Sequence, residues 1–190
     1  MLSLVVGLGN IGAAYAGTRH NIGFEVVRRV AEELKAEVQR STVEYDWACA
    51  LNGEQKPILA LPRLLMNRSG LAVEALLQRN ELTPTQMLVV VDDFNLPLGR
   101  LRFRSDGSDG GHNGLASIIE TLESEDFPRL RLGIGPPPDD IDSADFVLSR
   151  FETEEIEPKE KMIAAAAEAV LFAIGHPLDE AMSKYNVNPA

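Results

Sequence analysis

The sequence predicts an α/β fold: a single-domain, three-layer sandwich in which helices cover both faces of a mixed, twisted sheet. Strand-like apolar runs alternate along the chain with amphipathic helical segments, which is typical of a sheet covered by helices. Residues 87–91 are continuously apolar, as expected of a central strand buried on both faces. The 190 residues suit one domain, and no internal repeat or interdomain linker divides them.

Each predicted element follows from the spacing of its apolar residues. Six short apolar or alternating runs predict strands, at residues 2–7, 43–51, 57–61, 87–91, 99–104 and 129–134. Apolar residues at three- and four-residue steps predict helices at 21–37, 69–80, 115–122 and 154–174. The domain is expected to span residues 1–190, with 154–174 as its C-terminal helix and a short tail at 185–190.

The composition and charge of the chain narrow the classes of protein to which it could belong. The N-terminus lacks the basic lead and long apolar run of a signal peptide, and the most apolar later stretch is too short to cross a bilayer. We therefore expect a cytoplasmic protein without membrane contact. The single cysteine, Cys49, cannot form an intramolecular disulfide, and no cysteine or histidine spacing suggests a metal site. The net charge of −11, taken alone, argues against nucleic acid as a partner.

A glycine motif follows the first predicted strand. Gly7, Gly9 and Gly12 match the G-x-G-x-x-G fingerprint of dinucleotide binding. That fingerprint should open a helix at once, whereas helical periodicity begins here only near Asn21. A dinucleotide-binding oxidoreductase is therefore disfavoured. We interpret the glycines as a tight turn with close backbone approach.

Polar side chains gather where the predicted strands end. Asn10 follows the first strand, Asp92 follows the most apolar one, and His20 precedes the first helix. Ligands of open α/β sheets bind beyond the carboxyl ends of the strands. A carboxylate that accepts from one imidazole nitrogen fixes the tautomer and leaves the other nitrogen basic, so Asp92 and His20 could form such a pair. The alternative is an ordinary surface histidine. Because no G-x-S-x-G is present, attack by water with His20 as base is the simplest chemistry.

Asparagines and a glycine-rich stretch surround these positions. Asn10, Asn67 and Asn113 would supply amides that hold a peptide-like substrate or stabilise an oxyanion. Helix capping is the alternative for Asn67 and Asn113. The stretch 106–114 leads into a predicted helix and could act as a gate or as a plain flexible connection.

Two predicted strands carry arginines in alternation with apolar residues, at 100–104 and 129–132. Alternation on a strand places the guanidinium groups on one face. Their planar fork suits phosphate, so the stripe would provide a local RNA contact on an acidic protein. A solvated face paired with glutamates is the alternative.

Five motifs, in order over about residues 2–150, resemble bacterial-type peptidyl-tRNA hydrolases. They are Val6-Gly7-Leu8-Gly9-Asn10 with Tyr15 and Thr18-Arg19-His20-Asn21-Ile22-Gly23; Met66-Asn67-Arg68-Ser69-Gly70; Asp92-Asp93-Phe94-Asn95-Leu96-Pro97-Leu98-Gly99; Gly110-Gly111-His112-Asn113-Gly114-Leu115; and Arg129-Leu130-Arg131-Leu132-Gly133-Ile134-Gly135.

The resemblance implies hydrolysis of the ester that joins a peptide to the terminal ribose of tRNA, by a monomer without metal or cofactor. It implies that His20 activates the attacking water, that Asp92 keeps His20 basic and that Asn10 helps to recognise N-blocked substrates. The resemblance also implies two further sets of contacts: to the substrate at Tyr15, Leu65, Asn67 and Asn113, and to tRNA phosphate at Arg104 and Arg131.

Some positions depart from the family pattern. Ile11 replaces a usual proline, Leu65 an aromatic residue and Asn95 a common aspartate, while Ser108 and Asp109 interrupt a glycine-rich loop. Leu65 puts any aromatic contact there in doubt, and Asp109 adds a negative charge near the implied RNA path. A non-catalytic RNA-binding relative of the same fold is the alternative function. Retention of the implied base, its partner and the asparagines favours an enzyme.

Overall fold

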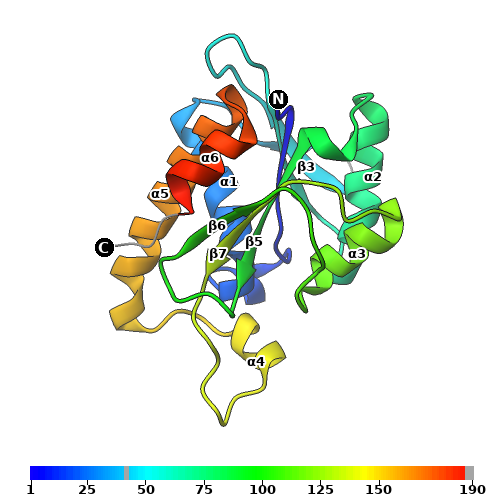
Figure 1. Ribbon diagram of the computed structural model, residues 1–190. Helices are drawn as coiled ribbons and strands as arrows, with labels where there is room; N and C mark the ends of the chain where they lie inside the picture. The colour runs from blue at the N-terminus through cyan, green and yellow to red at the C-terminus, as the bar shows by residue number, and fades with distance from the viewer. Residues whose placement is uncertain (41–42, 187–190) are drawn as a thin grey trace.

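The computed structural model describes residues 1–40 and 43–186, and within them one seven-stranded sheet lies between two groups of helices (Figure 1). The strands are β1 (Leu4–Gly7), β2 (Gln39–Arg40), β3 (Tyr45–Cys49), β4 (Ile58–Pro62), β5 (Met87–Asp93), β6 (Leu101–Arg104) and β7 (Arg129–Gly133). Their order is β2-β3-β4-β1-β5-β7-β6. β4, β1, β5 and β7 run parallel, whereas β2, β3 and β6 pair antiparallel with their neighbours. The predicted mixed sheet is confirmed.

Helices cover both faces of this sheet. The α-helices are α1 (Ile22–Glu33), α2 (Ser69–Arg79), α3 (Asn113–Leu122), α4 (Ser143–Leu148), α5 (Ile156–Gly175) and α6 (Leu178–Tyr185). The 3-10 turns are η1 (Ala13–Tyr15), η2 (Arg19–Asn21), η3 (Met66–Arg68), η4 (Pro84–Gln86) and η5 (Thr153–Glu155). In Figure 1, α1, α5 and α6 lie on one side of the sheet, and α2 and α3 lie on the other. The three-layer α/β architecture is therefore as predicted.

Strand β5 is the centre of the core. All seven of its residues are buried, and the five apolar ones alternate between two apolar clusters. Leu88 and Val90 pack with α1 and α5, whereas Val89 and Val91 pack with α2 and α3. The apolar run was predicted to end at Val91, but the strand continues through Asp92 and Asp93. Two carboxylates therefore stand at the carboxyl end of the most buried strand.

Several boundaries differ from the predictions. Helix α1 ends at Glu33 rather than near residue 37, because Lys35 has a left-handed backbone with φ 53°. The residues before Ile156 form η5 instead of the first turn of the long helix. Strand β2 and the short helices α4 and α6 were not predicted. Of the tail expected at 185–190, Tyr185 ends α6, and residues 187–190 lie outside the described residues.

None of the helices within residues 1–40 and 43–186 is both long and apolar enough to span a bilayer.

Where β1 meets α1, the glycines of the motif allow close packing of the backbone. A Cβ on Gly7 would lie 2.3 Å from the carbonyl oxygen of Gly23, and one on Gly9 would lie 2.7 Å from the Phe24 ring. A Cβ on Gly23 would lie 2.4 Å from the carbonyl oxygen of Val90. Because η1 and η2 intervene before α1 begins, no helix opens at the glycines. The interpretation as close backbone approach therefore fits the structure.

Gly23→Ala is expected to lower the free energy of unfolding by about 3 kcal/mol, because its methyl group must push apart β1, β5 and α1. Urea unfolding followed by Trp47 fluorescence measures the change. The control is Gly175→Ala at the end of α5, where an added Cβ meets nothing within 4 Å. That variant should be neutral or more stable by up to about 1 kcal/mol. Equal losses in both variants would contradict the packing argument.

Candidate active site

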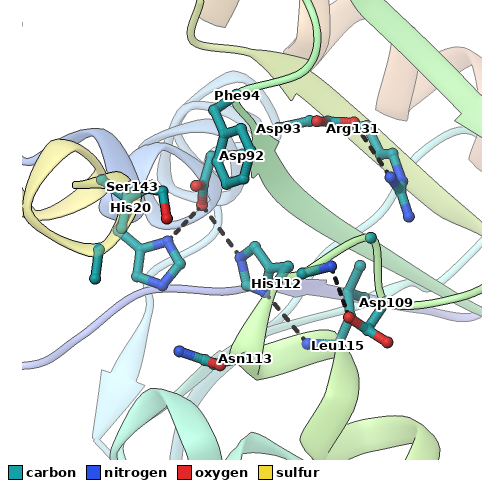
Figure 2. A pocket seen from close by; sticks show the side chains of 14 residues that line it. His20, Asp92, Asp93, Phe94, Asp109, His112, Asn113, Leu115, Arg131 and Ser143 are labelled. Atoms are coloured by element: carbon teal, nitrogen blue, oxygen red, sulfur yellow. Dashed lines mark hydrogen bonds and ion pairs between the residues drawn. The ribbon is translucent and has the colours of Figure 1, made fainter. Parts of the chain in front are cut away.

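A cavity of about 220 Å³ opens at the carboxyl ends of β5 and β7 (Figure 2). It is lined by His20, Asp92, Asp93, Phe94, Asp109, Gly110, Gly111, His112, Asn113, Leu115, Arg131, Ser143, Ala144 and Val147. These residues come from η2, the end of β5, the loop before α3, the first turn of α3, β7 and α4. The stretch 106–114, predicted as a gate or a connection, therefore supplies part of the wall.

The carboxylate of Asp92 stands at the centre of this cavity. Its Oδ1 accepts a hydrogen bond from His20 Nδ1 at 2.8 Å and a second from His112 Nε2 at 3.2 Å. All three side chains are buried. Burial alone would raise the pKa of Asp92, but the two imidazoles outweigh it and hold the pKa well below its usual range. Asp92 is therefore an ionised acceptor shared by two histidines.

His112 was not among the predicted site residues, and its tautomer is fixed by the fold. It precedes α3, and its Nδ1 accepts from the backbone N–H groups of Gly114 at 3.1 Å and Leu115 at 3.3 Å. An accepting Nδ1 carries no proton, so Nε2 carries it and donates to Asp92. The requirement to cap α3 therefore keeps His112 neutral and aimed at the carboxylate.

His20 differs from His112 in having a free nitrogen. Its Nδ1–H is committed to Asp92, while Nε2 makes no hydrogen bond among the described residues. Figure 2 shows this nitrogen turned toward the side of the cavity where Asn113 lies. The pair inferred from the sequence is thus within hydrogen-bond distance, and it exposes one imidazole lone pair to the cavity.

The same three side chains are the described group that could hold a metal ion, since their ligand atoms lie within 4.8 Å of one another. His112 fits that role poorly. Its Nδ1 is occupied by backbone N–H groups, and its Nε2 would have to lose the proton that it donates to Asp92. A ligand with no available lone pair leaves only His20 and Asp92, fewer than a stable site needs.

Asn10 is held in one orientation beside the cavity. Its backbone N–H donates to Asn21 Oδ1 at 2.7 Å, and Asn21 Nδ2 donates back to its carbonyl at 2.9 Å. Its own Oδ1 accepts from the Met66 backbone N–H at 3.2 Å. The Nδ2 of Asn10 is therefore left to donate. Asn10 lines a second cavity, of about 410 Å³, together with Ile11 and Arg63.

The remaining predicted substrate contacts are spread more widely. Asn113 lines the active-site cavity, but Tyr15, Leu65 and Asn67 line neither that cavity nor the one at Asn10 within the described chain. Leu65 and Asn67 flank Met66, whose N–H orients Asn10. The capping alternative is wrong for Asn113, because His112 caps α3, and Asn67 lies within η3 without a cap bond.

The arginine stripe divides into two kinds of side chain. Pairing of β6 with β7 sets Arg102 opposite Arg131 and Arg104 opposite Arg129, while the apolar residues between them join the core. Arg129 is fully buried. Its guanidinium donates to the carbonyls of Gly107, Ser108, Glu125 and Phe127.

Arg129 is therefore a structural anchor for the loop before α3. Burial, and then the charge of Arg131, lower its pKa to about 10, so it remains charged at neutral pH. It has no surface to offer a ligand.

Arg102, Arg104 and Arg131 line a separate cavity of about 340 Å³, with Ser108 in its wall, whereas Arg100 donates to the Asn186 carbonyl at 3.2 Å. The side chains of Arg102 and Arg104 make no hydrogen bond or ion pair to any described residue. Arg131 donates to Asp93 Oδ2 at 3.2 Å and to the Ser108 carbonyl at 2.8 Å, and it lines the active-site cavity as well. The alternative, in which these arginines pair with glutamates, is not seen among the described residues. The basic cavity and the active-site cavity thus share Arg131 as a wall.

Asp92→Asn should flatten the acid dependence of stability. The folded pKa of Asp92 lies below its unfolded value, so the stabilisation is present above about pH 4 and is lost as pH falls further. We expect the free energy of unfolding of the wild type to fall more steeply than that of the variant between about pH 5 and 3, as measured by urea unfolding. Asp179→Asn, on exposed α6, should parallel the wild type. Parallel curves for Asp92→Asn would contradict this assignment.

Known proteins match this chain over most of its length. The family model described as peptidyl-tRNA hydrolase matches residues 4–190. A peptidyl-tRNA hydrolase of Synechococcus sp. (strain JA-3-3Ab) is 46% identical over 188 residues, covering 97% of this chain and 83% of the relative. One from Chloroflexus aggregans is 44% identical over 184 residues, covering 96% and 98%.

Solved structures give the same result. The crystal structure of peptidyl-tRNA hydrolase from Acinetobacter baumannii superposes with a TM-score of 0.91 at 31% identity, covering 98% of this chain and 95% of that one. A peptidyl-tRNA hydrolase in complex with N-propanol superposes with a TM-score of 0.93 at 30% identity, covering 100% and 97%. The chain therefore belongs to the peptidyl-tRNA hydrolase family.

Proposed function

We propose that this enzyme hydrolyses the ester of peptidyl-tRNA by attack of a water molecule that His20 activates. The observation that carries the proposal is the hydrogen bond from His20 Nδ1 to the buried, ionised Asp92, which leaves Nε2 as a base facing the cavity. In the proposed reaction Nε2 takes a proton from water as its oxygen attacks the ester carbonyl. The ester bond to the ribose oxygen then breaks, and that oxygen takes the proton from the imidazolium.

Asp92 acts in this proposal through charge and orientation. Its carboxylate holds the Nδ1–H tautomer of His20 and stabilises the imidazolium that forms during attack. His112, a neutral donor to the same oxygen, orients the carboxylate without competing for the proton of water. Of the two histidines, His20 is therefore the one that can act as a base.

The roles of the asparagines are assigned from the side-chain amide atoms that remain free to bind substrate. Asn10 has a fixed amide with an available Nδ2, which suits it to donate to the carbonyl of an N-blocked peptide. Asn113 lines the cavity on the side faced by His20 Nε2, so its amide suits the attacking water or the developing oxyanion. Tyr15, Leu65 and Asn67 are assigned to more distant parts of the substrate. One chain supplies all of these groups, which supports action as a monomer.

His20→Ala is expected to lower kcat by about 10³-fold while leaving tRNA binding nearly unchanged, because the variant loses the base and no phosphate contact. Release of N-acetyl-amino acid from N-acetyl-aminoacyl-tRNA measures the first effect, and fluorescence anisotropy with labelled tRNA measures the second. The matched control is His176→Ala, an exposed histidine that stacks on Phe172 at the end of α5. Wild-type activity in His20→Ala would refute the mechanism.

The basic cavity is assigned to tRNA phosphate. Arg104 is exposed and Arg102 half-buried, and both have unused donors. Arg131 keeps a buried Nε without a partner among the described residues, in addition to its bonds to Asp93 and Ser108. Guanidinium forks bind phosphate bidentately, and such contacts fix the register of a nucleic acid. Phosphate held there would bring the acceptor end toward the adjoining active-site cavity.

Arg104→Ala is expected to raise KM about 5-fold with kcat within about 2-fold, and to reduce the slope of log binding constant against log salt by about one unit. Arg131→Ala should also raise KM more than it lowers kcat. Its kcat should fall somewhat, since the variant releases Asp93 and Ser108 beside the active-site cavity. Steady-state kinetics and salt titrations of tRNA binding measure these effects. Arg79→Ala, at the exposed end of α2, is the control; a loss confined to kcat in Arg104→Ala would exclude a phosphate contact.

A further inference from the structure

A buried arginine precedes His20 and joins its segment to the C-terminal part of the chain. Arg19 lies in η2 and is 3% exposed. Its guanidinium donates to both carboxylate oxygens of Glu155, at 3.1 and 2.5 Å. It also donates to Ser149 Oγ at 3.2 Å and to the Ile134 carbonyl at 3.3 Å. Each of its three nitrogens thus donates inside the protein, and the side chain is too buried to reach substrate.

Two aromatic rings complete the surroundings of this guanidinium. Its central carbon lies 4.3 Å from the centre of the Phe146 ring and 4.6 Å from that of Phe151. Backbone contacts run in parallel, because the Arg19 N–H donates to the Ser149 carbonyl at 2.9 Å and Thr18 bridges to Arg150. Residues 18 and 19 are therefore held by the segment that links α4 to α5.

A second ion pair holds the other side of His20. Lys159 Nζ, in α5, forms an ion pair with Glu25 Oε2, in α1, at 2.7 Å. The same Nζ lies 5.6 Å from the centre of the Phe151 ring. The Phe151 ring thus contacts both cations. The segment around His20 is therefore fixed to η5 by one ion pair, and the start of α1 is fixed to α5 by the other.

The Arg19 pair is not explained by stability alone. Removing two charges from water costs several kcal/mol, and apolar residues of similar volume are often as stabilising. Burial would raise the pKa of Glu155, but the hydrogen bonds from Arg19 and from the Glu152 N–H, together with the charge of Arg19, outweigh burial and lower it, so the pair is charged at neutral pH. The rigid, planar guanidinium group of Arg19 also gives a fixed direction to each hydrogen bond that it donates.

The position of Arg19 in the chain links its fixed orientation to the residues that line the active-site cavity. His20 is the next residue, and Asn21, in the same turn, orients Asn10. Phe146 stacks on Arg19 from α4, whose residues Ser143 and Val147 line the active-site cavity. A shift of Arg19 would therefore move His20 and α4 at once.

We propose that Arg19 is a positioning residue that, through Glu155, holds His20 Nδ1 on Asp92 and holds α4 against the cavity. The proposal rests on the proposed role of His20 as base. Displacement of a base by about 1 Å can cost about 100-fold in rate, so the effect is expected in kcat rather than in KM.

The experiment compares Arg19→Gln, Arg19→Lys, Glu155→Gln and the Arg19→Gln/Glu155→Gln double variant with the wild type. Arg29→Gln is the matched control, because Arg29 pairs with Glu33 at 3.0 Å on the exposed face of α1. Readouts are kcat and KM with N-acetyl-aminoacyl-tRNA, thermal unfolding, and the low-field proton resonance of His20 Nδ1–H. The loss of this resonance in His20→Ala assigns it.

Arg19→Gln is expected to lower kcat about 30-fold with KM within about 2-fold, and to shift or broaden the His20 resonance. Arg19→Lys keeps the charge but loses the fork, so it should recover part of kcat and of the resonance. Glu155→Gln should act in the same direction, and the double variant should be no worse than Arg19→Gln, since both remove one interaction. Arg29→Gln should match the wild type in all three readouts.

Three results would overturn the proposal: wild-type kcat in folded Arg19→Gln, a fall in kcat with an unchanged His20 resonance, or a change confined to KM. Should Arg19→Gln not fold, Arg19→Lys and Glu155→Gln are judged by the same criteria. A wild-type protein that fails to cleave N-acetyl-aminoacyl-tRNA would refute the proposed function instead. In that event the His20 resonance alone tests whether Arg19 positions the imidazole.

Discussion

The site depends on one buried carboxylate oxygen. Asp92 Oδ1 accepts from His20 and His112, and these three residues come from segments that are far apart in the sequence. An ionised carboxylate in the protein interior costs several kcal/mol unless donors offset the lost hydration. Both histidines must therefore donate to Asp92 for an ionised carboxylate to be stable at the buried end of β5. The same requirement brings together η2, the end of β5 and the start of α3, which form the floor and two walls of the cavity.

The geometry of α3 then decides what the two histidines can do. Backbone N–H groups at the first turn of a helix need acceptors, and His112 Nδ1 supplies one. Because Nδ1 accepts this bond, the proton of His112 is on Nε2, which donates a hydrogen bond to Asp92. With His20 Nδ1 also committed, one imidazole lone pair of the three residues remains, on His20 Nε2. A free imidazole lone pair that faces the cavity is what hydrolysis by an activated water requires.

Much of this arrangement could be predicted from the sequence, because it depends on local patterns. The apolar run before Asp92 indicated a central strand, and His20, Asn10 and Asn113 stood next to element ends. The role of His112 depends on backbone donors two and three residues later, which no residue pattern separates from an ordinary histidine. Arg129 and Arg131 were indistinguishable for a similar reason: both alternate on one face of β7, and the loop that covers Arg129 and leaves Arg131 open is set by tertiary folding. The six residues of α4 are too few to show a helical period after the prolines.

The distribution of arginines also resolves the conflict between an acidic chain and an RNA substrate. Arg19 and Arg129 are buried and donate to internal acceptors, and Arg19 uses one glutamate of the acidic segment that begins near Glu152. Those two arginines therefore fix backbone segments and contribute little to the outer field. Arg102 and Arg104 keep their donors free, and they lie on one edge of the sheet next to Arg131. Interactions between charges in water are screened within about 10 Å, so a phosphate at this edge responds to the local cluster far more than to the net charge of −11. Negative charge elsewhere would repel RNA from other faces, and it would thereby favour the one docking direction that brings the ester to His20.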